Sequence, residues 1–224
     1  MRDRIKDSKY YLDNISYEQI RINKFLEALN SLDESNVKGI ENGNLFLSGF
    51  YKNLFKLKYS AGFEVNEIFN EYLCWINHYR KVCNQNDSLY DLADLFAIGV
   101  FFDNRKKEFV DILLEIFNKC HVTDGMIKCF LSYLIGEEYQ YSESKFSYFE
   151  KLHLSKDKEN DLNECIASWY QLHNDAYWFD SHKSKNNVYC GYWSFDIGAV
   201  AKILNIRDAN LFNAEHYPYD LVHQ

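Results

Sequence analysis

Proline is nearly absent from this chain. Pro218 is the only proline in 224 residues, and glycine occurs nine times. Stretches rich in proline and glycine mark flexible linkers and the tight turns between strands. No Asn-Gly or Asp-Gly turn lies between alternating apolar runs, so hairpins are not indicated. We therefore expect no flexible linker, and a short strand pair at most.

The cysteines lack the spacing of a metal site. No CxxC pair occurs, and no histidine stands at the distance found in zinc fingers. Several cysteines lie among apolar residues, which is typical of buried thiols. The six are Cys74, Cys83, Cys120, Cys129, Cys165 and Cys190. We expect no metal, reduced thiols and a reducing compartment.

Long apolar runs are missing too. No stretch is long enough to span a bilayer. The charged start of the chain, Met1 to Asp7, is not followed by the apolar region of a secretory signal. The sequence therefore predicts a cytoplasmic protein without a membrane partner.

Familiar catalytic motifs are also absent. The chain has no Walker loop, dinucleotide fingerprint, Gly-x-Ser-x-Gly elbow or HExxH helix, so we assign no cofactor and no catalytic residue. The formal net charge is −8, and the lysines are dispersed among carboxylates. Because phosphate binding needs clustered basic side chains, nucleic acid is not an expected partner. A basic protein partner suits the charge.

The residues that are present favour helices. Apolar side chains recur at helical spacing, and aromatic residues make up 17% of the chain. We predict an all-α, compact multi-helix bundle of two closely packed helical halves, 1–122 and 123–224. The first helix starts near Ser8, or at Ser16, where a capping box fits. The other expected helices cover about 44–60, 64–82, 87–101, 104–121, 126–135, 146–154 and 158–172, with an exposed loop at 180–187.

The least polar long run extends from Tyr189 to Leu204 and predicts a central helix. Its apolar residues cover most of the helical circumference, so protein should surround it. Ser194 can cap the start of this helix. Gly191 and Gly198 remove side chains where another backbone can approach closely.

The segment Tyr217-Pro218-Tyr219-Asp220 predicts an extended strap rather than another helix, because proline restricts its own backbone and that of the preceding residue. Buried tyrosine hydroxyls need acceptors. We expect Asp196 or Asp220 to bind tyrosine hydroxyls and to hold the strap to the body of the protein. The residues predicted to be structural are Gly191, Tyr192, Trp193, Asp196, Tyr217, Pro218, Tyr219 and Asp220.

Clusters of carboxylates are the candidate binding residues. A charge run is usually a solvated face, but aromatic side chains among the charges favour a binding site. Tyr139 and Tyr141 stand among carboxylates in this way. The candidates are Asp87, Asp91, Asp94, Glu137, Glu138, Tyr139, Tyr141, Glu143, Asp157, Glu159 and Asp161.

Two other functions stay open on the residues alone. One is a hydrolase or modifying enzyme, in which His173 and Asp175 meet His216 and Asp220 if the strap folds back, because a base bonded to a carboxylate is a catalytic unit. Neither segment has the spacing of a known metal or nuclease motif, and histidines bonded to carboxylates are common in helical cores. The other is a helical adaptor protein.

Two groups of motifs resemble a known family. The run Tyr189-Cys190-Gly191-Tyr192-Trp193-Ser194-Phe195-Asp196 and the closing Tyr217-Pro218-Tyr219-Asp220-Leu221 resemble the C-terminal signature of PoNi-type immunity proteins, the antidotes to PoNe polymorphic DNase toxins. Arg2-Asp3 and Tyr10-Tyr11 resemble the N-terminal region of that family. One departure is Asp196, which stands where glutamate predominates.

This resemblance implies an all-helical cytoplasmic protein that binds a cognate DNase delivered by a neighbouring bacterium and prevents it from cutting host DNA. The net charge of −8 agrees with this function. The DNA-binding face of such a toxin must attract phosphate and is therefore expected to be basic. We expect inhibition by a stoichiometric complex in which carboxylates mask that face. The signature residues would hold the fold together.

Overall fold

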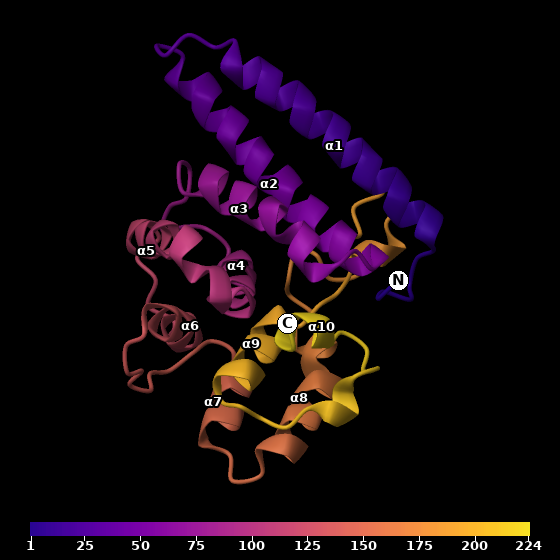
Figure 1. The fold of residues 1–224 in the computed structure, drawn as a ribbon, viewed down its shortest axis with the longest axis vertical. Helices are drawn as coiled ribbons and strands as arrows, with labels where there is room; N and C mark the ends of the chain where they lie inside the picture. Colours follow the sequence, from indigo (N-terminus) through magenta and orange to yellow (C-terminus); the bar gives the residue numbers. More distant parts are fainter. The chain divides into compact units, whose positions relative to one another are not determined.

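The computed structural model describes residues 1–224, and every regular element is a helix, which confirms the all-α prediction (Figure 1). The α-helices are α1 (Ser8–Asn30), α2 (Val37–Ala61), α3 (Phe69–Tyr79), α4 (Leu89–Phe101), α5 (Val110–Lys119), α6 (Gly125–Ile135), α7 (Ser147–Leu154), α8 (Lys158–Leu172), α9 (Phe195–Ile203) and α10 (Tyr219–Val222). Short 3₁₀ helices lie at Val65–Ile68 (η1), Asp103–Glu108 (η2), Ser181–Lys183 (η3) and Ala209–Leu211 (η4). No helix is both long and apolar enough to cross a bilayer.

The chain divides into two compact units. Unit 1 consists of residues 1–83 and 180–191, and unit 2 of residues 84–179 and 192–224. These units differ from the sequence regions 1–122 and 123–224, and that division stays a prediction. Hydrogen bonds explain why 180–191 belongs to unit 1. One of them runs from the Ser60 hydroxyl to the Cys190 carbonyl over 2.7 Å.

Unit 1 is built on the antiparallel pair α1 and α2, with α3 packed against α2 (Figure 1). α1 begins at Ser8 because the Asp7 side chain caps it, accepting a 2.8 Å hydrogen bond from the Tyr10 amide. The alternative start at Ser16 is wrong. Ser16 lies inside α1, where its hydroxyl donates to the Leu12 carbonyl.

α2 begins earlier than the expected residue 44. Asn36 caps its start by accepting a 3.0 Å hydrogen bond from the Gly39 amide, so Gly39 and Gly43 lie within the helix. Its end was correctly placed. Gly62 takes the left-handed conformation, with φ of 94°, and its amide donates to the Tyr59 carbonyl.

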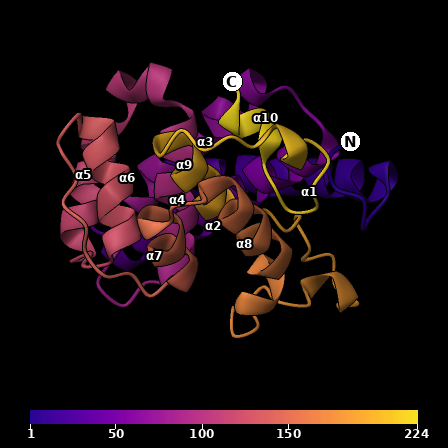
Figure 2. The same cartoon turned by 90° about the horizontal axis from the view of Figure 1, so that it is seen from below.

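Unit 2 is organised around α9, so the central place of the apolar run is confirmed. The helix is shorter than the run, because residues 189–194 are not helical and 189–191 belong to unit 1. The Ser194 side chain does not cap α9, contrary to the prediction. Residues 195–201 are all buried, and α9 contacts α4, α6, α7, α8 and α10. Two views show α9 beside α7 and α8 (Figures 1 and 2). Gly198 permits close packing, since a Cβ there would lie 2.8 Å from Cγ of Pro218 and 3.1 Å from Cζ of Phe101.

The C-terminal tail is not the extended strap that its proline suggested. Residues 209–211 and 219–222 form helical turns, and Pro218 directly precedes α10. A helix tolerates proline at its start because the first amides have no partner within the helix. Ser194 fixes the tail, since both its amide and its hydroxyl donate to the His216 carbonyl, over 2.8 and 2.9 Å.

The thiols are packed as small apolar groups. None of the six cysteines forms a disulfide. Cys83, Cys120, Cys129 and Cys165 are buried, while Cys74 and Cys190 are partly buried. Burial raises the pKa of Cys129 to about 12, so its thiol is protonated at neutral pH.

Candidate functional site

Asp196 is the centre of a buried network that joins three helices of unit 2. It lies in the first turn of α9 and is 3% exposed. Its Oδ1 accepts hydrogen bonds from Nε1 of Trp169 in α8 (3.1 Å) and from the Ile197 amide (2.8 Å), and its Oδ2 accepts from the Tyr148 hydroxyl in α7. Burial, followed by the charge of Asp196, raises the pKa of Tyr148 well above its usual value. The tyrosine therefore stays a donor, and the network ties α7 and α8 to α9.

His173 completes this network from the end of α8. Its Nδ1 lies 2.7 Å from the Trp169 carbonyl oxygen, which only accepts, so Nδ1 carries a proton. Its Nε2 lies 3.7 Å from Oδ2 of Asp196, which is an electrostatic contact rather than a hydrogen bond. Burial alone would lower the pKa of His173, but the Asp196 carboxylate outweighs burial, and the pKa is raised overall.

His173 also lines a pocket of about 600 Å³, together with Tyr90, Tyr148 and Asp175. The four residues of the hydrolase hypothesis are not paired there as expected. Asp175 accepts a 2.5 Å hydrogen bond from the Tyr90 hydroxyl, and Nδ1 of His216 lies 3.0 Å from the Tyr192 carbonyl oxygen. His173 faces Asp196 instead of Asp175, which makes it part of a structural network.

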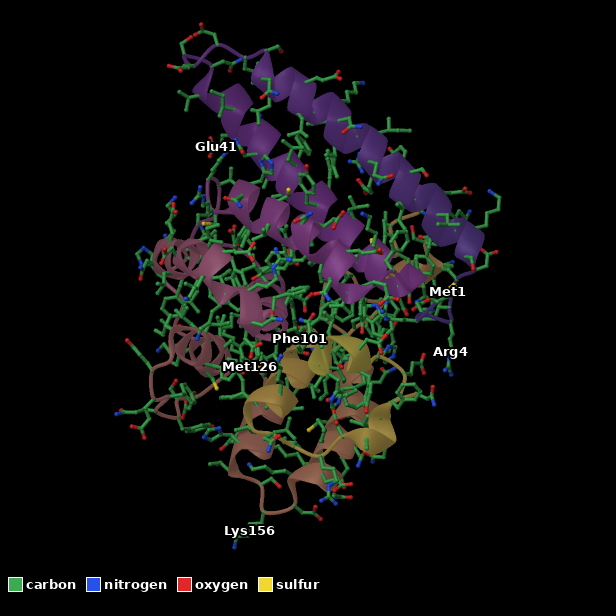
Figure 3. The ribbon with its side chains drawn as sticks, viewed as in Figure 1. Met1, Arg4, Glu41, Phe101, Met126 and Lys156 are labelled. Atoms are coloured by element: carbon green, nitrogen blue, oxygen red, sulfur yellow. The ribbon has the colours of Figure 1, made fainter.

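The acidic start of α8 is partly neutralised within the chain. Asp157 caps the helix, and Asp161 accepts a 2.5 Å hydrogen bond from the Ser155 hydroxyl. The Ser155 bond, followed by Lys151 of α7 at 3.3 Å, lowers the pKa of the Asp161 carboxyl. Glu159 is exposed and belongs to no ion pair. In Figure 3, Lys156 marks the turn between α7 and α8.

The three aspartates at the start of α4 serve the local structure. Asp87 closes a turn by accepting hydrogen bonds from the amide and the side chain of Asn84, over 3.1 and 3.0 Å. Asp91 accepts a 2.8 Å hydrogen bond from the Tyr177 hydroxyl. Asp94 is half-buried, and its charge adds to the raised pKa of His173. These carboxylates are less open than their spacing suggested.

Residues 137–143 carry the most open candidates. The segment has no regular secondary structure and packs its two tyrosines on α7. The Tyr141 ring stacks on His153, with centroids 5.0 Å apart, and the Tyr139 ring meets Phe149 edge-on at 6.2 Å. The exposed carboxylates of this segment are Glu137, Glu138 and Glu143, and none of them belongs to an ion pair. The aromatic residues thus support the segment while the carboxylates face solvent.

Charge is distributed unevenly between the two units. Unit 2 contains 21 acidic and 11 basic side chains, a net charge of −10, whereas unit 1 contains 12 and 14, a net charge of +2. Every candidate carboxylate lies in unit 2. The whole acidic excess of the chain is therefore a property of the unit built on α9.

Comparison with known proteins decides the family. Residues 2–114 match PoNe immunity protein (PoNi), N-terminal, and residues 122–221 match PoNe immunity proteins (PoNi), C-terminal. This chain belongs to the PoNi family. Protein PA2201 from Pseudomonas aeruginosa has a similar fold. Its crystal structure aligns at a TM-score of 0.71 over 97% of this chain and 88% of that one, with 14% sequence identity. No curated protein matches the chain.

Most aromatic residues of the motifs that resemble the PoNi signature are buried, whereas Asp220 is exposed. Tyr189, Tyr192, Trp193 and Tyr217 are all buried. The N-terminal motif has a similar place, because Oδ2 of Asp3 accepts a 2.5 Å hydrogen bond from the Tyr189 hydroxyl. This bond joins the start of the PoNi chain to segment 180–191 within unit 1. These contacts agree with the structural role predicted for the signature, and that role stays a prediction.

Sequence reasoning missed three residues with central positions. Tyr148 is the hydroxyl partner of Asp196, in place of a strap tyrosine. Asp208 accepts a 2.6 Å hydrogen bond from Tyr217 and holds the tail. Neither pairing has a local sequence signal. Asp124 does have one, because it directly precedes a helix, as capping residues do.

Proposed function

We propose that this PoNi-family chain protects its cell by binding a single PoNe-type DNase toxin and covering the surface with which the toxin binds DNA. Family membership supports a toxin as the partner. The net charge of −10 in unit 2 is the observation that carries the mechanism. A DNase needs a basic surface to attract phosphates, and an acidic partner meets such a surface faster and with greater specificity.

The proposed contact residues are acidic and aromatic side chains of segment 137–143 and acidic side chains at the start of α8. The open carboxylates of 137–143 and Glu159 supply charge without first breaking an ion pair. The contact set is Glu137, Glu138, Tyr139, Tyr141, Glu143, Asp157, Glu159 and Asp161. Asp87, Asp91 and Asp94 add to the negative field of the same unit. Because the DNA to be protected lies in the cytoplasm, we place the complex there.

Complex formation, rather than catalysis, is the proposed mode of inhibition. His173 is the buried histidine that a hydrolase would use, but its Nδ1 is bonded to a backbone carbonyl and its Nε2 faces Asp196. A general base needs a nitrogen within reach of the proton that it removes. The arrangement of His173 supports a structural role.

The test is a titration of nuclease activity. A purified PoNe-type DNase toxin from the same strain is mixed with increasing amounts of the protein, and cleavage of linear duplex DNA is measured. We expect cleavage to stop at an equimolar ratio. Complete protection at a small fraction of that ratio would favour a modifying enzyme, and no protection at any ratio would favour an adaptor.

A further inference from the structure

Asp124 holds the C-terminal end of the loop that carries Glu137, Glu138 and Glu143. It is 7% exposed and caps α6, where its Oδ1 accepts hydrogen bonds from the amides of Met126 (2.9 Å) and Ile127 (3.3 Å). Its Oδ2 accepts from the Lys145 amide over 2.9 Å, and both oxygens accept from the Ser144 hydroxyl over 3.0 Å. One carboxylate therefore holds a helix start and a loop end together.

Gly125 brings the same loop into contact with α6. Its amide donates a 2.8 Å hydrogen bond to the Glu143 carbonyl. A Cβ at this glycine would lie 1.9 Å from the carbonyl oxygen of Ser142, so no other residue fits while the loop keeps its position. The backbone of the loop is thus placed by contacts on both sides of Glu143.

The middle of the loop is closed by Tyr139. Its hydroxyl accepts a 2.9 Å hydrogen bond from the Ser142 amide, while its ring packs on Phe149 and His153 of α7. At the other end, Gly136 ends α6 in the left-handed conformation, with φ of 78°. A loop of about ten residues without regular structure that is held at so many points is typical of a functional loop.

We propose that residues 137–146 form a preorganised docking loop for a basic patch on the toxin, and that Asp124 is the positioning residue that sets its conformation. The proposal rests on the proposed function. Its physical basis is that a loop already held in the binding conformation loses less entropy when it binds. The exposed carboxylates of Glu137, Glu138 and Glu143 are then presented as one fixed group.

The substitution Asp124→Asn separates the two roles of this side chain. Asparagine caps helices as well as aspartate does, so its amide oxygen can replace Oδ1 toward Met126 and Ile127. Its amide nitrogen takes the place of Oδ2 and cannot accept from the Lys145 amide. The variant should therefore keep α6 and release the loop.

A second variant reaches the loop without touching Asp124. Tyr139→Phe removes the hydroxyl that accepts from Ser142 and keeps the ring on α7. Asp7→Asn is the matched control, because Asp7 caps α1 in unit 1 and the substitution removes the same charge far from the loop in sequence.

The experiment combines amide hydrogen exchange of the free protein with binding kinetics to the PoNe-type toxin used in the nuclease titration. In Asp124→Asn we expect faster exchange at Lys145 and about tenfold weaker binding, as follows if the bound conformation falls to about a tenth of the population. Tyr139→Phe should speed exchange at Ser142 and also weaken binding. Asp7→Asn should bind as the natural protein does.

Each other outcome has a definite meaning. Faster exchange with unchanged binding in both variants would overturn the docking role of the loop. Unchanged exchange at Lys145 in Asp124→Asn would overturn the anchoring role of Asp124. If Asp124→Asn fails to fold, Tyr139→Phe alone decides the docking role. If the natural protein does not bind the toxin in the same measurement, the proposed function itself is wrong.

Discussion

Gly198 of α9 lies directly against the ring of Pro218, so that a Cβ at Gly198 would be 2.8 Å from Cγ of the proline. The same Cβ would lie 3.1 Å from Cζ of Phe101 and 3.2 Å from Cγ2 of Val222. The single proline of the chain is therefore packed on the one position of α9 that has no side chain. The tail and the central helix depend on each other at this contact.

Gly198→Ala should destabilise the protein. Alanine gains about 1 kcal/mol over glycine within a helix, but overpacking a rigid contact costs about 1–3 kcal/mol. We expect a net loss, measured as a lower midpoint in urea unfolding. Gly49→Ala in α2 is the control, because no atom lies within 4 Å of its added Cβ, and it should raise the midpoint. A higher midpoint for Gly198→Ala would show that the proline ring can move aside.

Tyr148→Phe should be costly because it takes a donor from a buried carboxylate. Hydrogen bonds to charged groups contribute about 1.5–3 kcal/mol, and we expect a loss of free energy of unfolding in that range. Tyr90→Phe removes a similar bond, to Asp175, at an exposed site, and should change stability by about 0.5 kcal/mol or less. Equal losses in the two variants would argue against a special role for the Asp196 network.

The pair His173 and Asp196 predicts a dependence of stability on pH. The pKa of His173 is raised above its ordinary value of 6.5 in the folded protein. The stabilisation is therefore fully present below pH 6.5 and is lost as pH rises through the raised pKa. Unfolding in urea at several pH values between 5.5 and 8.5 should show this loss, and NMR of the ring protons should place the His173 titration above pH 6.5. A titration below 6.5 would contradict the assignment.

His78 provides the opposite case in unit 1. Burial, aided by the charge of Lys81, lowers its pKa to about 4. The neutral ring stacks on Tyr51 and places Nδ1 2.9 Å from Oδ1 of Asn44. Its protonation therefore destabilises the folded state as pH falls from 6.5 toward 4. In one NMR titration the two histidines should separate to opposite sides of pH 6.5.

Periodicity was sufficient for most of the helices, because a buried face leaves a strong pattern in the sequence. The apolar circumference of α9 predicted its central place in unit 2. Capping signals were weaker guides. Ser16 and Asp7 are both residue types that cap helices. Asp7 is the actual cap, and the residues before Ser8 make their own contacts outside the helix, such as the bond from the Ile5 amide to Asp3. Proline also misled, since Pro218 starts a helical turn as easily as it ends one.

Pairings between distant residues could not be predicted. Asp196 was expected to bind a tyrosine hydroxyl, but its partner Tyr148 lies 48 residues away and is one of 18 tyrosines. Which candidate carboxylates are exposed could not be predicted either. The sequence made both Asp91 and Glu137 candidates, and only the fold shows that Asp91 accepts a hydrogen bond from Tyr177 while Glu137 is exposed. Exposure is decided by tertiary packing.

The open carboxylates predict a salt-dependent association with the toxin. The double variant Glu137→Gln, Glu138→Gln should associate several-fold more slowly at low ionic strength, because opposite charges accelerate encounter. The difference should shrink as salt rises, since the screening length falls from about 10 Å at 0.1 M to about 3 Å at 1 M. Stopped-flow or surface-based kinetics at three salt concentrations would measure both effects.

The control for that experiment is Glu41→Gln, an exposed carboxylate of α2 in unit 1 (Figure 3). It lies in the unit whose net charge is +2 and outside every acidic cluster. Its removal should leave the association rate within the scatter of the natural protein. If Glu41→Gln slows association as much as the double variant does, then the net charge of the protein governs the association rate. Glu137 and Glu138 would then have no specific role in the encounter with the toxin.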